Sequence, residues 1–139
     1  MGLDFGERCD AIEACYEFML AYAGQGLASD EGSQSGGQVR EFLGRAAQAM
    51  IGLADSCMQS VEGQGLEATG KFRAFIAVLD RDARDSLAAL ELVLAQPVIS
   101  SQLIDNLNAS IHLRALLTDL FLFDETLKAQ RRSKPAVTS

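Results

Sequence analysis

The sequence contains no tryptophan, only two prolines and a single histidine in 139 residues. It also lacks a long apolar run. Its most apolar stretch, residues 111–123, is interrupted by Arg114 and Asp119, whereas a membrane-spanning helix needs about 20 consecutive apolar residues. The first ten residues carry acidic side chains and no basic region before an apolar one, which is unlike a secretory signal. We therefore expect a cytoplasmic protein without a membrane span.

Cysteine is scarce too, and the three cysteines follow no recognised spacing. Cys9, Cys15 and Cys57 match neither CxxC nor CxxCH, so the sequence predicts no disulfide framework, no zinc site and no covalently attached haem. Cys9 and Cys57 fall on apolar helical positions, while Cys15 lies off that pattern, and we expect it to be the more exposed thiol. The glycines form neither of the common phosphate-binding motifs.

Positive charge is in short supply. Twelve bases against nineteen acids give a net charge of -7, so phosphate backbones and anionic lipid surfaces should repel most of the chain, and we expect no nucleic-acid partner. The bases gather near the C-terminus, at Lys128, Arg131, Arg132 and Lys134. We interpret residues 129–139 as a flexible, solvated basic tail.

Apolar residues recur every three or four positions in four segments, which is the spacing of an amphipathic helix. The first segment ends near Gly24 and the second at Gly63, and glycine is typical of helix C-caps. The apolar positions are Phe5, Cys9, Ile12, Tyr16, Met19 and Ala23 in the first segment, and Val39, Leu43, Ala46, Met50, Leu53, Cys57 and Val61 in the second. Residues 28–38, which are small and polar, predict a mobile loop between these two helices.

The other two segments flank Pro97. The third helix carries Phe72, Ile76, Leu79, Ala83, Leu87, Leu90 and Leu94 on one face. Pro97 disfavours helical geometry at the residue before it, and Ser100 or Ser101 can cap a fourth helix that runs to about Lys128. The pattern allows either a hairpin or a bent continuous rod at Pro97.

Four amphipathic helices with no strand-like alternation predict an all-α fold. The arrangement that buries each apolar stripe against the other three is an antiparallel four-helix bundle, with helices three and four broken or bent at Pro97. We expect one helical-bundle domain over residues 1–128.

The fourth helix departs from a simple stripe, because its apolar side chains point in nearly all directions. In a monomeric bundle one side of such a helix would face water. The surplus apolar surface therefore predicts a homodimer or a docking surface for another protein. The predicted partner interface consists of Leu113, Leu116, Leu117, Leu120, Phe121 and Phe123.

His112 lies on the same side of the fourth helix as Asp105, Asn108 and Asp119. Converging groups of this kind can transfer protons or bind a metal, with the acidic row Asp10, Glu13 and Glu17 as further ligands. The Glu-x-x-His motifs of di-iron bundles are missing, however. We interpret His112 as a hydrogen-bonded residue on the wetter rim of the helix, and we predict neither a metal site nor catalytic residues.

Two functions are compatible with this pattern. The first is a non-enzymatic interaction module, an accessory, adapter or chaperone-like factor that self-associates or docks a partner through its fourth helix. The alternative is a ligand-sensing or cofactor-binding bundle, with a small molecule in the core between helices one, two and four, near Met19, Met50 and His112. Methionine at stripe positions more often fills a core, and no motif names a cofactor, so we expect none.

Overall fold

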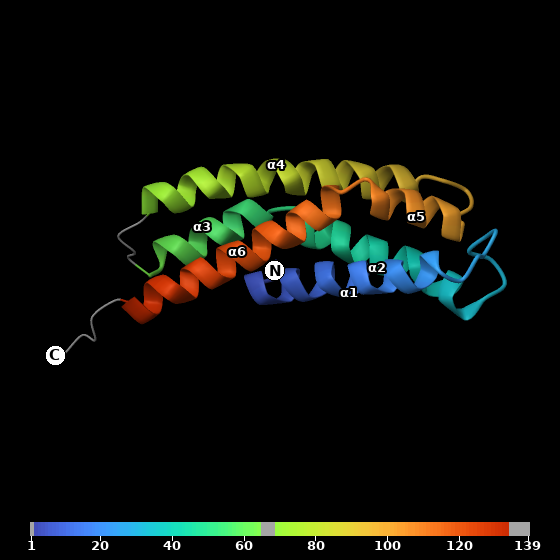
Figure 1. The fold of residues 1–139 in the computed structure, drawn as a ribbon, viewed down its shortest axis with the longest axis horizontal. Coiled ribbons are helices and arrows are strands. Elements are labelled where there is room, and N and C mark those ends of the chain that lie inside the picture. The colour runs from blue at the N-terminus through green and yellow to red at the C-terminus, as the bar shows by residue number, and fades with distance from the viewer. Residues whose placement is uncertain (1, 65–68, 134–139) are drawn as a thin grey trace.

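The computed structural model describes residues 2–64 and 69–133, and every regular element in these ranges is a helix. The described residues form α1 (Phe5–Ala23), α2 (Gln34–Met50), α3 (Leu53–Glu62), α4 (Thr69–Leu94), α5 (Ser101–Ala109) and α6 (His112–Ser133), as drawn in Figure 1. The predicted all-α class is confirmed. A simple bundle of four helices is not, because two of the four predicted helices are each divided in two.

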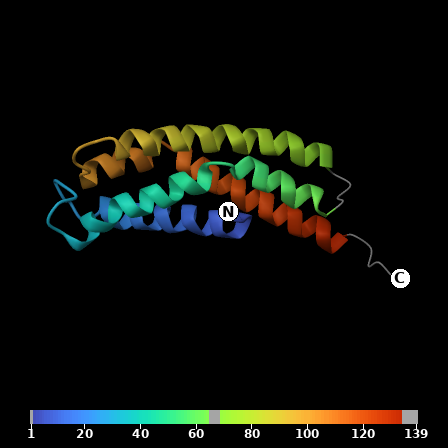
Figure 2. The same ribbon diagram turned by 180° about the vertical axis from the view of Figure 1, so that it is seen from behind.

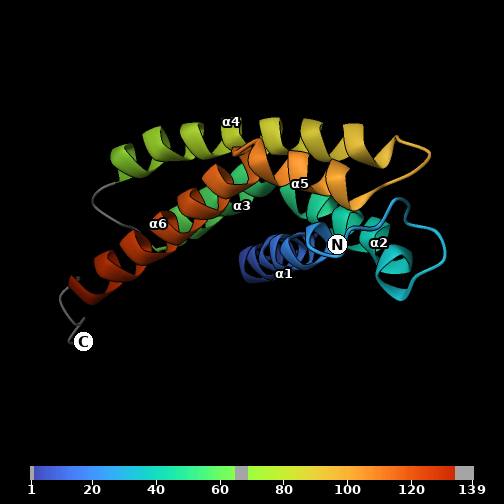
Figure 3. The ribbon, with the colours of Figure 1, turned by 45° about the vertical axis from the view of Figure 1, so that its right-hand side comes forward.

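The long helix α4 runs along one side of the molecule, as Figures 1 and 2 show from opposite faces. α2 and α3 follow one another in a bent arm, and so do α5 and α6. α1 packs mainly against α2 and α5, whereas α6 packs mainly against α4. α6 diverges from α1 toward its C-terminal end (Figure 3).

Both bent arms are broken at a residue with a left-handed backbone. Gly52, between α2 and α3, has a φ of 80°, and Ile111, between α5 and α6, has a φ of 66°. Left-handed geometry interrupts the helical hydrogen-bond ladder. The predicted continuous helices over residues 39–61 and 100–128 are therefore wrong at these two positions. The apolar spacing continues across each break and so conceals it.

A buried arginine of α1 caps the end of α2. The Arg8 side chain lies in the core face of α1, and the residue is only 9% exposed. Its Nη1 donates hydrogen bonds to the backbone oxygens of Ala49, at 2.9 Å, and Ile51, at 2.5 Å. The last carbonyls of a helix have no partner within the helix, and a guanidinium can satisfy several at once. Arg8 thereby ties α1 to the break between α2 and α3.

The buried face of α1 keeps Ile12 and Met19 of the predicted stripe, but its other three members each lie one residue before a predicted position. Its buried members are Arg8, Ile12, Cys15, Met19 and Tyr22. Cys15 is fully buried and Cys9 is only partly buried, so the expectation that Cys15 is the more exposed thiol is wrong. The apolar spacing did not predict this face because one of its buried positions, Arg8, holds a charged residue.

α2 begins at Gln34, so residues 34–38 are helical and the prediction that they belong to the loop is wrong. The reason is a local cap. Ser33 Oγ accepts a hydrogen bond from the backbone N–H of Gly36, at 2.9 Å, and a serine in this position satisfies a donor that the first turn leaves free.

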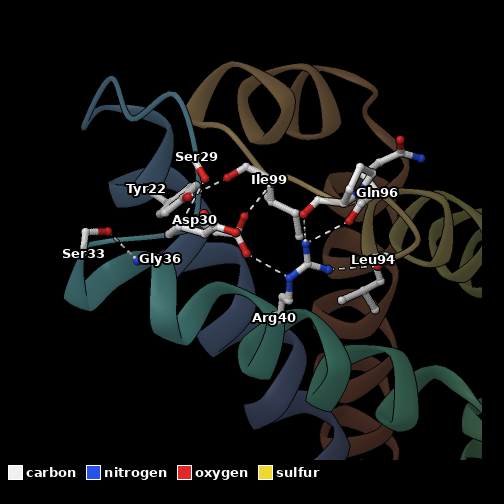
Figure 4. A network of polar contacts seen from close by, with 11 residues as sticks. Tyr22, Ser29, Asp30, Ser33, Gly36, Arg40, Leu94, Gln96 and Ile99 are labelled. Atoms are coloured by element: carbon white, nitrogen blue, oxygen red, sulfur yellow. Dashed lines mark hydrogen bonds and ion pairs between the residues drawn. The ribbon is translucent and has the colours of Figure 1, made fainter.

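The shortened loop is bound to the loop between α4 and α5, as Figure 4 shows. The Asp30 carboxylate accepts hydrogen bonds from the backbone N–H of Ile99, at 2.8 Å, and from Arg40 Nε, at 2.9 Å. The hydrogen bond from Ile99, followed by the Arg40 guanidinium, holds the pKa of Asp30 below its usual range. The same guanidinium donates to the backbone oxygens of Leu94, at 3.0 Å, and Gln96, at 2.8 Å. One arginine thus caps α4 and fastens two loops together.

Pro97 marks a hairpin rather than a bent rod. α4 ends at Leu94, and α5 begins at Ser101 and runs back beside it (Figure 1). Three predicted caps are confirmed. Ser100 is the N-cap of α5, and Gly24 and Gly63 are the C-caps of α1 and α3.

The C-terminal boundary also differs from the prediction. α6 continues to Ser133, so residues 129–133 of the predicted flexible tail are helical. Lys134 and the rest of that tail lie outside the described residues.

Candidate interaction surface

Five of the six residues predicted to form the partner interface lie inside the bundle. Leu113, Leu116, Leu117, Leu120 and Phe123 are each at most 6% exposed, whereas Phe121 is 54% exposed. The Phe123 ring packs edge-on between the rings of Phe5 and Phe72, with centroids 5.4 and 5.9 Å away. The expectation that these side chains exceed what their own chain can cover is therefore corrected for these five. α6 is separated from α5 by the break at Ile111, which lets it turn its apolar side toward α4.

The exposed face of α6 nevertheless keeps large apolar side chains. Leu122 is 51% exposed, beside Phe121, and Ile111 at the start of the helix is 61% exposed. Successive helical residues point about 100° apart, so Phe121 and Leu122 flank the outward side of α6. Each leaves apolar area in water, and removing apolar area from water is favourable by about 25 cal/mol per Å² before the costs of association are subtracted. Adjacent exposed apolar residues on one helix are typical of a protein-binding surface.

A groove of about 360 Å³ lies between α4 and α6, beside Leu122. Its walls are mainly apolar. They are formed by Lys71, Phe72 and Phe75 of α4 and by Leu122, Thr126, Ala129 and Gln130 of α6. Here the two helices leave space that a side chain from another molecule can fill.

Four exposed charged side chains of α6 form no ion pair within the part of the chain that the structure describes: Arg114, Glu125, Arg131 and Arg132. Arg131 instead donates a hydrogen bond to Gln64, at 2.6 Å. Arg114 and Glu125 carry opposite charges and are eleven positions apart, close to three helical turns, so they lie on the same side of α6. Opposite charges at the two ends of one face can pair with a second, reversed copy of that face.

Two acidic residues meet where α4 packs against α6, which we call the α4–α6 seam, about one helical turn along α6 from Leu122. Asp119 of α6 is 9% exposed, and its carboxyl meets that of Asp82 on α4. Burial, followed by the hydrogen bond to Asp82 and its charge, raises the pKa of Asp119 to about 7. Among the described residues Asp119 Oδ2 has no hydrogen-bond donor. A proton on Asp119 therefore limits the repulsion between the two carboxyl groups, and its loss leaves two carboxylates close together.

The three thiols are poor candidates for nucleophilic chemistry. Burial raises the pKa of Cys9, Cys15 and Cys57 to about 12. The thiolate is the reactive form of cysteine, so at neutral pH these side chains behave as small apolar residues.

The structure does not assemble the group predicted around His112. His112 and Asp105 are exposed, whereas Asp119 is buried in the seam with Asp82. In residues 2–64 and 69–133, no three His, Cys, Asp or Glu side chains gather closely enough to hold a metal ion. Met19 and Met50 are buried in the core, so they do not share an open site with His112.

Sequence reasoning missed three of the features that matter most on this surface. Asp119 carried a usable signal, because Leu116, three positions before it, and Phe123, four positions after it, both face the core. No sequence pattern indicates that Leu122 lies beside the groove or that Ile111 has a left-handed backbone. Both features depend on how α6 meets α4 and α5.

Comparisons with protein-family models, with curated proteins and with solved structures find no match. None of the helices in the described ranges combines the length and apolar character needed to cross a membrane.

Proposed function

We propose that this protein is a non-enzymatic interaction module that associates with a second copy of itself through the exposed face of α6. The observation that carries the proposal is the pair Phe121 and Leu122, adjacent on one helix and each about half exposed. Ordinary surface apolar residues are scattered singly, whereas these two are adjacent, and Leu122 lines an apolar groove. An accessory or adapter role is consistent with a helical face that offers mainly apolar surface for packing against another protein.

The charges favour a second copy as the occupant of this face. The whole chain carries a net charge of -7, so most faces of two copies repel each other. Residues 112–133 are different, because they hold four basic and three acidic side chains. A twofold dimer needs a self-complementary surface, and Arg114 and Glu125 on one side of α6 provide this.

Sedimentation velocity across a concentration series tests the proposal. We expect a reversible dimer for the wild-type chain and at least tenfold weaker association for the double variant Phe121→Gln/Leu122→Gln, in which glutamine keeps the helix propensity but removes the apolar surface. The matched control is Leu92→Gln, because Leu92 is 67% exposed on α4. It should dimerise like the wild type.

The proposal also has a clear failure. A wild-type chain that sediments as a monomer at concentrations of about 100 µM, where a weak specific interface would be populated, would overturn it. A dimer weakened equally by the α6 variant and by Leu92→Gln would overturn the assignment to α6.

A further inference from the structure

We propose that, in this dimer, Ile111 of each copy inserts into the groove between α4 and α6 of the other copy. The inference rests on the proposed self-association and specifies its register. It assigns an occupant to the groove and a purpose to an unusual backbone conformation.

The first observation is the conformation of Ile111. Its φ is 66°, in the left-handed region that β-branched residues rarely adopt because the side chain crowds the backbone. Such strain persists where it serves a purpose and is compensated elsewhere. Within its own chain Ile111 is not compensated by burial, since it is 61% exposed. The strained backbone projects a branched aliphatic side chain into solvent at the start of α6.

The second observation is a receptor of matching chemistry on the same molecule. The groove holds about 360 Å³ between Phe75 on α4 and Leu122, Thr126 and Ala129 on α6. Phenyl, aliphatic and methyl groups make up most of these walls, and they favour an aliphatic side chain over a charged one. Ile111 lies at the N-terminal end of α6, whereas the groove lies along its C-terminal half. In an antiparallel dimer, Ile111 of each copy would therefore lie near the groove of the other copy.

The third observation concerns the register. In an antiparallel pair of α6 helices, an ion pair between Arg114 of one copy and Glu125 of the other places residue 111 opposite residue 128. Position 128 lies between Thr126 and Ala129, two residues that line the groove. The register that pairs Arg114 with Glu125 therefore also seats Ile111, and twofold symmetry repeats both contacts at the other end.

Disulfide trapping tests this register. In a Cys9→Ser background, which leaves only the fully buried Cys15 and Cys57, we would introduce Ile111→Cys and Ala129→Cys together. The two positions are about 27 Å apart along one helix, too far for a disulfide within the chain. Mild oxidation with copper phenanthroline should give a covalent dimer. Each single variant should stay uncrosslinked, because its two copies are about 25 Å or more apart in this register.

Two further variants separate the groove from the fold. Ala129→Phe fills the groove, and we expect the dimer to weaken at least tenfold, whereas Ala88→Phe on the exposed side of α4 should leave it unchanged. Ile111→Gly relieves the backbone strain. It should raise the melting temperature of the monomer at low concentration and weaken the dimer, a combination that no merely structural role for Ile111 explains. Circular dichroism would verify the helical fold of every variant.

The possible failures are distinct. A dimer in sedimentation velocity without a covalent link between positions 111 and 129, or with crosslinking in the single variants, would overturn this register and leave the proposed self-association standing. A chain that stays monomeric would overturn both. An Ala129→Phe variant that dimerises normally would exclude the groove as the receptor.

Discussion

Replacing Gly36 by alanine should destabilise the protein, although alanine is the better helix former. Gly36 lies in the first turn of α2, and a Cβ at this position would lie 2.1 Å from the backbone oxygen of Asp30 and 2.6 Å from its carbonyl carbon. Backbone atoms cannot rotate away as the end of a side chain can. The loop must therefore move, and its movement disturbs the hydrogen bonds of Asp30 to Arg40 and to the N–H of Ile99, of 2.9 and 2.8 Å.

The magnitude follows from these bonds. Hydrogen bonds to a charged group contribute about 1.5–3 kcal/mol each, so loss of both costs roughly 3–6 kcal/mol, and the gain in helix propensity returns about 1 kcal/mol. We expect the free energy of unfolding of Gly36→Ala to fall by about 2–5 kcal/mol, measured by urea denaturation and circular dichroism.

A neighbouring glycine supplies the control. Gly37 follows in the same helix, and a Cβ there meets nothing within 4 Å. Gly37→Ala should therefore raise the free energy of unfolding by about 0.5–1 kcal/mol. Equal effects of the two substitutions, or a stabilising effect at Gly36, would refute the reasoning that the close approach of the loop requires glycine.

Three other perturbations probe the contacts between helices. The pKa of Asp119 is raised from 3.8 to about 7, so the folded state holds its proton more tightly than the unfolded state, and stability should fall as the pH rises from about 4 to 7. Asp119→Asn should flatten that dependence and raise the free energy of unfolding at pH 8 by about 2 kcal/mol. This is roughly half of the free energy that the full pKa shift represents, because the acid pair keeps some contact with water. Urea denaturation at pH 5 and pH 8 measures this, and an unchanged pH profile would contradict it. Arg8→Met leaves the carbonyls at the end of α2 without their donor and should lower the free energy of unfolding by about 2–4 kcal/mol, with a corresponding fall in melting temperature. Tyr22→Phe removes the hydrogen bond of 2.7 Å to the oxygen of Ile99 and should cost about 1–1.5 kcal/mol in the same denaturation assay. Little or no loss in either variant would show that the bond is replaced by water.

The proposed dimer changes how the surplus of apolar residues in α6 is understood. Most of these residues stabilise the chain itself, and the remaining exposed ones, Ile111, Phe121 and Leu122, are candidates for binding. The acid pair of Asp82 and Asp119 lies in the same seam as the groove. A variant such as Asp119→Asn should therefore be checked for association as well as for stability.

The sequence alone determined the all-α class, the approximate position of most helices and several of their ends. The reason is that helical spacing and capping act over a few residues. Apolar residues at intervals of three and four commit a segment to a helix, Ser100 caps α5 through its own side chain, and Pro97 prevents α4 from continuing.

Tertiary structure decided what depends on distant partners. Whether α2 continues past Ile51 is settled by Arg8, 43 positions earlier in the chain, whose guanidinium holds the freed carbonyls. The burial of Leu116 and the exposure of Leu122 depend on where α4 packs, because apolar residues on every side of a helix do not specify which side is covered. The meeting of Asp119 with Asp82 and the groove beside them arise from the same packing, so local spacing could not reveal them.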